Sequence, residues 1–309
     1  MDLVRGLEAL PLANGPSAVT VGFFDGIHLG HQAVIGRTVE AARSRSLEPV
    51  AVTFDRHPRE IYAAGTEPPL LTTLERKAAL IDGLGVGTLL VLEFTRELSL
   101  WPPADFAVRV LARGLHASHV VVGSNFTFGF KAEGKLETLA ELGTGLGFTV
   151  EGMGLLEVDG RTVSSSSIRG ALAAGDLDWP ALALGRRYVL DGRVVDGAGR
   201  GAGLGFPTAN LAVRPKLLLP ADGVYAGRAL TGKGAFAAAI NVGTNPTFGK
   251  EPRHVEAFLL GFHGDLRGEA LAVEFWARLR EELRFDSPEA LARQIGLDVE
   301  RTRALVAGP

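Results

Sequence analysis

The N-terminal half of the chain alternates between short apolar runs and longer segments in which apolar residues recur at helical spacing. Short apolar runs bounded by glycine or polar residues are typical of buried strands, and the segments between them are typical of amphipathic helices. The predicted strands are 18–24, 49–54, 88–94, 119–123 and 148–156, and the predicted helices are 28–45, 74–84, 103–115 and 167–174. Alternation of this kind predicts an α/β fold with a parallel sheet.

Beyond Leu184 the pattern changes to short β-rich segments separated by glycine. The predicted strands are 188–195, 223–230, 236–242, 254–260 and 270–279. Such segments, recurring at about ten residues with turn signals between them, predict a small antiparallel barrel. The tail from Ser287 has a serine cap, a proline at the first helical position and helical apolar spacing, so we expect a terminal helix. The change of pattern divides the chain into predicted domains 1–183 and 184–309.

The amino-acid composition and charge exclude several classes of protein and of functional site. The 309 residues carry a formal net charge of −3, with 46% hydrophobic and 22% charged residues, which predicts a soluble chain that builds a core. Cysteine is absent, which excludes disulfides, thiolate metal sites and a cysteine nucleophile. The start lacks a long apolar stretch, so we expect a cytoplasmic protein without a membrane partner. The near-neutral charge argues against a nucleic-acid partner, so any phosphate site must be local.

The first candidate site is the turn between the first predicted strand and helix. It reads Gly22-Phe23-Phe24-Asp25-Gly26-Ile27-His28-Leu29-Gly30-His31. The amides at a helix N-terminus bind anions, and two histidines three residues apart share one helix face, where they can stabilise charge on a phosphate. Gly30 would let a nucleotide approach the backbone. The alternatives are a capped helix with surface histidines, or half of a metal site, which the positive helix end disfavours.

Three further segments complete a set of four ordered motifs. They are Thr53-Phe54-Asp55-Arg56-His57-Pro58, Val122-Gly123-Ser124-Asn125-Phe126-Thr127-Phe128-Gly129 and Val163-Ser164-Ser165-Ser166-Ser167-Ile168-Arg169. Together with the histidine turn they resemble the nucleotidyltransferase superfamily, specifically the adenylyltransferase half of bacterial bifunctional riboflavin kinase/FAD synthetases. The chain departs from the usual family motifs at Arg56, Thr127 and Lys135.

The resemblance implies a Rossmann-like nucleotidyltransferase domain that transfers AMP from ATP to FMN. The attacking FMN phosphate is already anionic, so the reaction needs positioning groups and hydrogen-bond donors more than a strong base. His28 and His31 are then the catalytic residues, and Asn125 is a flavin contact. The residues expected to bind the ATP phosphates are Gly22, Phe24, Asp25, Gly26, Gly30, Ser164, Ser165 and Arg169. A serine-rich loop followed by an arginine suits phosphate, although alone it would be read as an ordinary helix cap.

The second candidate site begins in a glycine-dense stretch from Gly192 to Gly205. The following Leu204-Gly205-Phe206-Pro207-Thr208-Ala209-Asn210-Leu211 resembles the riboflavin kinase signature, which implies that Gly205, Pro207, Thr208 and Asn210 bind ATP. Thr208 and Asn210 are hard oxygen donors of the kind that Mg²⁺ prefers. Without the resemblance, a flexible hairpin would explain the glycines.

Later segments of this domain also resemble the kinase family. The family places its catalytic base at the glutamate of Val255-Glu256-Ala257-Phe258, and Asn241-Val242-Gly243-Thr244-Asn245-Pro246-Thr247-Phe248 precedes it. A carboxylate suits a reaction whose nucleophile is a neutral ribityl hydroxyl. A glutamate in an alternating strand is otherwise usually a solvated residue. The segment from Leu279 to Ser287 resembles the border of the flavin pocket, which implies Arg280 and Phe285 as flavin contacts.

Three functional hypotheses follow. The leading one is a bifunctional enzyme that binds riboflavin, FMN, FAD and ATP, with Mg²⁺ as cofactor. The second is an enzyme with only one working domain, and the departures at Arg56, Thr127 and Lys135 make the N-terminal domain the candidate for loss. The third is a flavin-binding sensor without turnover, against which the retained His28, His31 and Glu256 argue.

Overall fold

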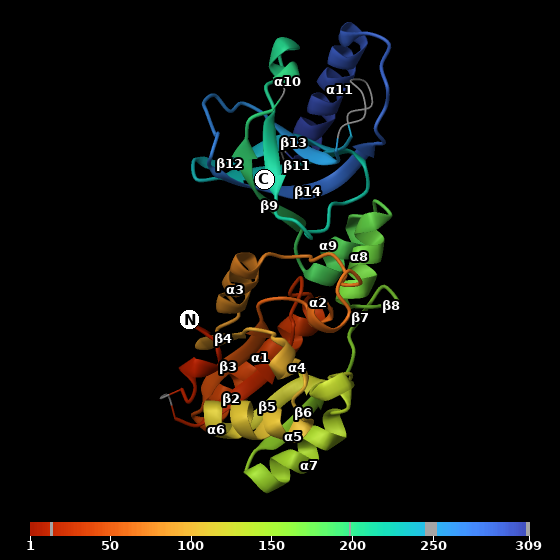
Figure 1. Cartoon of the computed structure of the whole chain (residues 1–309). Coiled ribbons are helices and arrows are strands. Elements are labelled where there is room, and N and C mark those ends of the chain that lie inside the picture. Colours follow the sequence, from red (N-terminus) through yellow and green to blue (C-terminus); the bar gives the residue numbers. More distant parts are fainter. Residues whose placement is uncertain (13–14, 198, 245–251, 307–309) are drawn as a thin grey trace. The chain divides into compact units, whose positions relative to one another are not determined.

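The structure is a computed structural model that describes residues 1–12, 15–197, 199–244 and 252–306. The chain forms two compact units (Figure 1). Unit 1 comprises Met1–Pro68 and Thr73–Ser164, and unit 2 comprises Pro69–Thr72 and Ser165–Pro309.

Unit 1 is built on a six-stranded sheet. Its strands are β1 (Asp2–Arg5), β2 (Ser17–Val21), β3 (Glu48–Phe54), β4 (Thr88–Leu92), β5 (Ala117–Gly123) and β6 (Thr149–Met153). They lie in the order β1-β4-β3-β2-β5-β6, and every neighbouring pair is parallel, which confirms the predicted sheet. In the sheet, β3 lies on one side of β2 and β5 lies on the other, so the strand order reverses direction at β2. Open α/β sheets bind ligands at such a reversal, outside the carboxyl ends of the strands.

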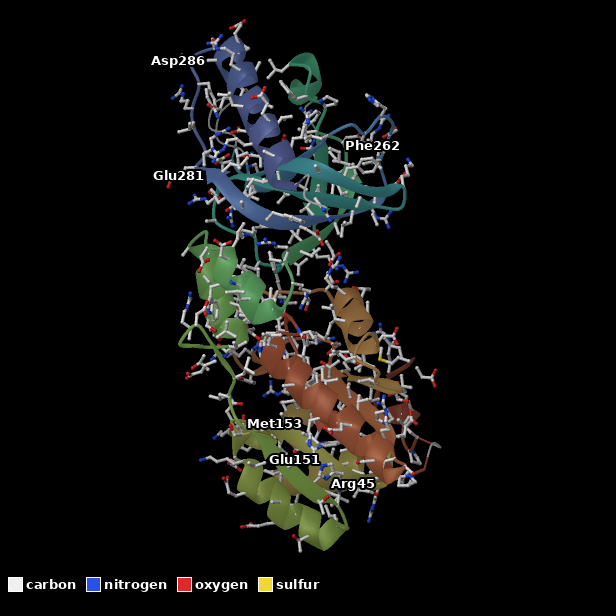
Figure 2. The ribbon with its side chains drawn as sticks, turned by 180° about the vertical axis from the view of Figure 1, so that it is seen from behind. Arg45, Glu151, Met153, Phe262, Glu281 and Asp286 are labelled. Carbon is white, nitrogen blue, oxygen red and sulfur yellow. The ribbon has the colours of Figure 1, made fainter. Side chains whose placement is uncertain are left out.

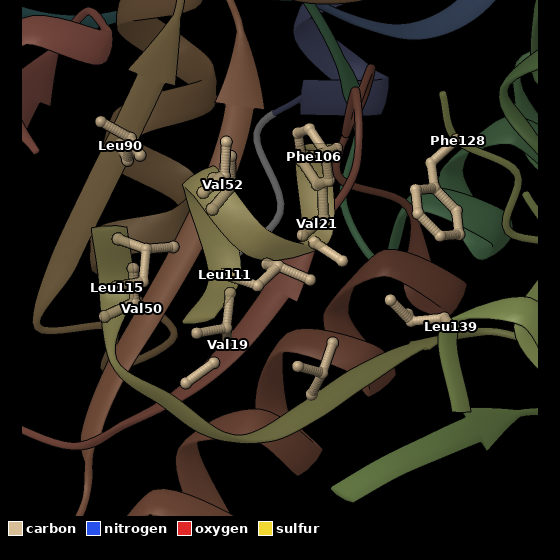
Figure 3. Close-up of a cluster of buried hydrophobic side chains, with 14 of the residues drawn as sticks. Val19, Val21, Val50, Val52, Leu90, Phe106, Leu111, Leu115, Phe128 and Leu139 are labelled. Atoms are coloured by element: carbon tan, nitrogen blue, oxygen red, sulfur yellow. The ribbon is translucent and has the colours of Figure 1, made fainter. Parts of the chain in front are cut away.

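Helices cover both faces of this sheet. Alternate residues of the strands point to opposite faces, so Ala51 and Leu89 pack with α1 (Leu29–Arg45) and α3 (Leu74–Asp82). Val50 and Leu90 instead belong to the larger cluster drawn in Figure 3, together with Phe106, Leu111, Leu115 and Leu139. This second face is covered by α5 (Pro103–Phe106), the π-helical stretch η2 (Ala107–Ala112), α6 (Arg113–Leu115) and α7 (Leu136–Leu146). Unit 1 is therefore a three-layer α/β/α structure.

An ion-pair network fixes α1 to the sheet. Arg37 Nε on α1 donates to Glu151 Oε1 on β6 at 2.7 Å, and His119 Nε2 on β5 lies 3.4 Å from Glu151 Oε2. The hydrogen bonds from Arg37 hold the pKa of Glu151 below its usual value. Figure 2 labels Glu151 together with Arg45, whose Nη1 donates to Thr149 Oγ1 at 3.4 Å. These contacts fix the helix whose N-terminus carries the histidine turn.

Unit 2 contains a closed antiparallel barrel, as predicted. Its strands are β9 (Tyr188–Val195), β10 (Ala209–Val213), β11 (Gly223–Thr231), β12 (Gly234–Gly243), β13 (His254–Leu259) and β14 (Ala270–Arg280), in the order β10-β13-β12-β11-β14-β9. Tyr225 and Phe275 fill the interior with their rings edge to face at 5.2 Å. The expected terminal helix is α11 (Pro288–Val306), which packs on β11, β12 and β14.

Several short elements complete the two units. In unit 1 these are η1 (Leu7–Ala9), α2 (Arg59–Tyr62), α4 (Arg96–Ser99), η3 (Phe130–Ala132) and the hairpin β7 (Glu157–Val158) with β8 (Arg161–Thr162). In unit 2 they are α8 (Ser165–Ala173), α9 (Asp178–Leu184) and α10 (Arg200–Gly203). Among the described helices, none is long and apolar enough to cross a lipid bilayer.

Candidate functional site

The histidine turn leaves the sheet earlier than the sequence predicted. The predicted strand ran to Phe24, but β2 ends at Val21 and the chain then enters a loop with positive φ at Phe24 (+53°), Gly26 (+83°) and Ile27 (+41°). The prediction was wrong because apolar side chains alone do not distinguish a strand from a buried loop. Phe24 and Ile27 are 3% and 1% exposed and anchor the loop in the core beneath α1. Their burial offsets the cost of the left-handed backbone.

His28 caps the N-terminus of α1. Its Nδ1 accepts the backbone N–H of His31 at 3.3 Å, so the ring hydrogen of neutral His28 lies on Nε2. The His28 and His31 rings stack with centroids 3.6 Å apart. A Cβ on Gly30 would lie 3.2 Å from the His28 ring and 4.0 Å from the Val163 carbonyl oxygen. A side chain at this position would therefore push against the His28 ring.

His31 presents a polar atom that nothing in the described part of the chain satisfies. Its Nδ1 is buried and has no hydrogen-bond partner there. Burial, the neighbouring His28 and then Lys77 lower the pKa of His31 well below its usual value, so the ring is neutral at physiological pH. A buried ring nitrogen without a partner costs free energy that a bound ligand can recover. This atom and the helix amides beside it suit a phosphate group.

Lys77 is the residue of this site that the sequence reasoning missed. It lies on α3 and is only 3% exposed. Its Nζ donates to the Phe23 carbonyl oxygen at 2.6 Å and lies 3.3 Å from Thr53 Oγ1. The signal was available, because Leu74, Lys77 and Ile81 share one face of a helix and a lysine is unusual on a buried face.

The departures from the usual motifs lie outside the histidine turn. Arg56 pairs with Asp55, with Nη2 and Oδ2 2.6 Å apart, and its Nη2 also lies 3.4 Å from Glu93 Oε1. Thr127 and Lys135 are exposed, and Lys135 is the N-cap residue of α7. None of these three side chains has a described contact with His28 or His31.

The remaining predicted residues of the adenylyltransferase site are distributed over both units. Asn125 is exposed after β5, next to the strand that leads into the histidine turn. Ser164 is the last residue of unit 1, directly after Val163, whose carbonyl faces Gly30. Ser165 and Arg169 belong to α8 of unit 2, where Arg169 Nε donates to the Pro69 carbonyl oxygen at 2.7 Å. Asp25 is 2% exposed inside the turn. Their roles stay predictions.

A second constellation lies on the barrel around Glu256. This residue of β13 pairs in register with Asn210 of β10 on one side and Asn241 of β12 on the other. Thr208 Oγ1 donates to Glu256 Oε2 at 3.2 Å, and His254 Nε2 lies 3.2 Å from Glu256 Oε1. The carboxylate is thus held between two side chains. The sequence reasoning assigned no role to His254, although the predicted strand 254–260 already places it two residues from Glu256 on the same face.

The glycine stretch folds back onto this constellation. A Cβ on Gly197 would lie 2.0 Å from Asn210 Nδ2, and one on Gly201 would lie 2.4 Å from the Phe206 carbonyl oxygen. Gly205 has φ of +87°, which favours glycine. The short helix α10 interrupts the stretch that was expected to be a loop. The close approaches account for Gly197 and Gly201, and the positive φ accounts for Gly205.

The donor set around Glu256 can be tested against the expected magnesium ion. No group of three His, Cys, Asp or Glu side chains among the described residues is arranged to hold a metal. The Thr208 hydroxyl lies against the Glu256 carboxylate, and Asn210 is opposite Glu256 in the strand register. These oxygen donors match the preference of Mg²⁺, which keeps several water and phosphate ligands. The predicted ligands therefore fit the ion. Residues 245–251, with the second half of the Asn241–Phe248 motif, lie outside the described part.

Arg280 and Phe285, the predicted flavin contacts, lie close to each other. The Arg280 guanidinium lies 5.7 Å from the centre of the Phe285 ring. It also donates to Asp298 of α11, with Nη2 to Oδ2 2.8 Å and Nε to Oδ2 3.0 Å. Asp298 is 2% exposed, so this ion pair fixes α11 to the end of β14. Flavin contact by either residue stays a prediction.

Comparisons with known proteins match both units. The sequence profile of the FAD synthetase family matches residues 11–167, and that of the riboflavin kinase family matches residues 184–306. A bifunctional riboflavin kinase/FMN adenylyltransferase from Pseudomonas fluorescens is 40% identical over 308 residues, covering 99% of this chain and 98% of its own. One from Bacillus subtilis (strain 168) is 34% identical, covering 91% and 90%.

A solved structure with the same fold carries a different name. It is called a macrolide-efflux protein, from Streptococcus pneumoniae, and is similar with a TM-score of 0.85 and 28% identity. The match covers 98% of this chain and 99% of that one.

Proposed function

The chain belongs to the family of bifunctional riboflavin kinase/FMN adenylyltransferases, and on that premise we propose which residues carry its two reactions. It phosphorylates riboflavin with ATP to give FMN and ADP, and it adenylylates FMN with ATP to give FAD and pyrophosphate. The proposed domains are 1–183 for adenylyl transfer and 184–309 for the kinase reaction. One observation carries the assignment, which is that the His28/His31 pair and the Glu256/Thr208 pair belong to different units.

In adenylyl transfer, an oxygen of the FMN phosphate attacks the α-phosphorus of ATP and pyrophosphate leaves. His28 is proposed to donate through Nε2 to a triphosphate oxygen, since its Nδ1 is used by the helix cap. Neutral His31 can donate a hydrogen bond without adding a full charge to the site. The glycines and helix amides of the turn bind phosphate oxygens, and Ser164, Ser165 and Arg169 add hydroxyls and a bidentate cation. Asn125 is proposed to contact the flavin. Stabilisation of transferred charge is the main contribution of such a site.

In the kinase reaction, the ribityl hydroxyl of riboflavin attacks the γ-phosphorus of a second ATP and ADP leaves. Glu256 is proposed to accept the hydroxyl proton, because a carboxylate within hydrogen-bond reach raises the nucleophilicity of a neutral alcohol. Thr208 and Asn210 are proposed to hold the Mg²⁺ of Mg-ATP, which neutralises phosphate charge when bound. Gly205 and Pro207 shape the loop on the nucleotide. Arg280 and Phe285 are proposed to border the flavin ring. ATP as substrate is consistent with a cytoplasmic place of action, which we also propose.

The test is a chromatographic flavin assay with ATP and Mg²⁺, started in parallel from riboflavin and from FMN. We expect FAD from both starts with the unchanged chain. Glu256→Gln should abolish FMN formation and spare FMN adenylylation, and His28→Ala should do the reverse. Glu269→Gln is the matched control, because Glu269 pairs with Lys233 at the surface, with Oε1 and Nζ 2.9 Å apart.

Each competing hypothesis predicts a different pattern of products. FMN accumulation with no FAD from either start would leave the kinase as the one working domain. No product from either start would favour a flavin sensor. Equal loss of both reactions in Glu256→Gln would reject the assignment of one reaction to each unit.

A further inference from the structure

Lys77 is a buried cation directly beneath the histidine turn. Its Nζ reaches from α3 to the Phe23 carbonyl oxygen at 2.6 Å, and the Phe23 ring centre lies 4.2 Å from the same nitrogen. Thr53 Oγ1, at the end of β3, lies 3.3 Å from Nζ and itself donates to the Phe23 carbonyl at 3.1 Å. One carbonyl oxygen of the turn therefore receives two hydrogen bonds from two different elements.

The carbonyl that Lys77 holds comes immediately before the strained part of the turn. Phe24 follows with φ of +53°, and Gly26 and Ile27 also have positive φ. A non-glycine residue in this region persists only where its surroundings over-determine the backbone. The turn then leads into His28 and the first turn of α1. A shift of the Phe23 peptide would therefore displace both histidines.

We propose that Lys77 is a positioning residue for adenylyl transfer, which fixes the histidine turn by holding the Phe23 carbonyl and thereby places His28 and His31 against the triphosphate. The inference rests on the proposed role of the two histidines. Lys77 touches neither of them through a described hydrogen bond, so it acts through the loop and through its charge.

The charges around Lys77 add a second effect. The charged and titratable groups that act on it are Asp25 in the turn, Asp55 after β3, and His31 on α1. Burial lowers the pKa of Lys77 to about 8, while Asp25 and Asp55 act in the opposite direction. Lys77 is therefore a cation at neutral pH, and its charge is one of the causes that keep His31 neutral. The same cation orders the loop and favours the neutral form of the histidine.

The first experiment replaces Lys77 with methionine, which fills a similar volume without the ammonium group. For Lys77→Met we expect kcat for FMN adenylylation to fall by about 10- to 100-fold, the usual consequence of a misplaced catalytic group, with the KM for ATP changed by less than about threefold. Riboflavin phosphorylation by the same molecules should be unchanged, which shows that unit 2 is folded, and the retained KM for ATP in adenylylation shows that unit 1 is folded. Arg43→Met, which removes an exposed charge from α1, is the matched control and should leave both reactions unchanged.

A pH profile separates this role from simple packing. Adenylylation by the unchanged chain should decline above pH 8 as Lys77 loses its proton, since its pKa is about 8. The residual activity of Lys77→Met should lack that decline. Because removing a buried charge relieves a desolvation cost, the unfolding temperature of Lys77→Met should not fall. If Lys77 only packed, Lys77→Met would keep both the kcat for adenylylation and the pH profile of the unchanged chain.

Chemical rescue gives an independent arm, since the chain has no cysteine. Lys77→Cys can be alkylated in denaturant with 2-bromoethylamine, which restores an ammonium group at nearly the original length, and then refolded beside an unchanged chain treated identically. We expect alkylation to restore adenylylation at least fivefold over the unalkylated variant.

The outcomes distinguish the inference from the function on which it rests. Full adenylylation by Lys77→Met, or no gain on alkylation of Lys77→Cys with the kinase reaction intact, would overturn the role of Lys77. Full activity of His28→Ala would instead overturn the assignment of the histidines, whatever the Lys77 variants do.

Discussion

Replacing Asp298 with asparagine should destabilise unit 2 through the loss of one buried ion pair. Asp298 of α11 is 2% exposed and Arg280 of β14 is 16% exposed. The carboxylate accepts Arg280 Nη2 at 2.8 Å, Arg280 Nε at 3.0 Å and Gln294 Nε2 at 3.1 Å. Asparagine keeps the shape but removes the charge, and its amide presents a donor where Arg280 requires an acceptor. The guanidinium is then left buried without its counter-charge.

The magnitude follows from the burial of the pair. Removing one partner of a buried ion pair typically costs about 3–5 kcal/mol. Arg280 keeps some solvent contact and a hydrogen bond from Nη1 to the Glu281 carbonyl, so the lower end applies. We expect the free energy of unfolding of unit 2 to fall by about 3 kcal/mol, which lowers its transition temperature by about 6–12 °C for a domain of this size.

The assay is scanning calorimetry of the full chain, and the loss of riboflavin phosphorylation when the unchanged chain is heated identifies the transition of unit 2. A double-mutant cycle of Asp298→Leu, Arg280→Met and the two together isolates the pair. The double variant should recover most of the stability, since apolar side chains can replace a buried ion pair at little cost. Glu269→Gln, which removes only a surface ion pair with Lys233, is the matched control and should leave the transition unchanged.

Two results would refute this reasoning. If Asp298→Asn shifts the transition by less than about 2 °C, the pair is effectively solvated and its geometry contributes little. If the effects of Asp298→Leu and Arg280→Met simply add, the two side chains are not coupled. Either result would also weaken the view that this ion pair fixes α11 to the barrel.

Two further predictions concern unit 1. Because the pKa of Lys77 is lowered from 10.5 to about 8 in the folded chain, the unfolded chain binds more protons between these pH values. The free energy of unfolding should therefore rise with pH across that window, by about 3 kcal/mol in total, and a comparison of urea midpoints at pH 7 and 10 should show this rise for the unchanged chain but not for Lys77→Met. Gly30→Ala would place a Cβ 3.2 Å from the His28 ring, so FMN adenylylation should fall by about tenfold while phosphorylation persists. Gly36→Ala, whose Cβ would meet nothing within 4 Å on the same helix, should leave both reactions unchanged.

The sequence predicted a strand correctly where its residues form one continuous buried apolar run. The central strands β3 and β5 are buried on both faces and read as continuous apolar runs, which is why 49–54 and 119–123 were found. Strand β1 was missed, because it is a mostly exposed strand at the edge of the sheet, next to β4. Strand β10 was missed because it follows the glycine and proline residues of the kinase motif and has a single buried residue, Leu211. Its place between β9 and β13 is set by tertiary pairing.

The sequence motifs identified the principal residues of both candidate sites, but not the residues that hold them in place. His28, His31 and Glu256 could be read from short segments, because the residues of each motif are close in sequence. Lys77 meets Phe23 across 54 positions of sequence. No local pattern encodes such a contact, and only the lysine on a buried helix face hinted at it.

His254 illustrates the opposite limit, since it lies two residues from Glu256 and was still given no role. Residues two apart on a strand share a face, so proximity to Glu256 follows once β13 is recognised as a strand. What the sequence could not supply is the contact on the other side of the carboxylate, where Thr208 approaches from the segment before β10. Glu256 is held from both sides only because β10 pairs with β13. Strand β10, which the sequence pattern did not predict, closes the barrel. The same strand pairing therefore brings the residues of the proposed kinase site together.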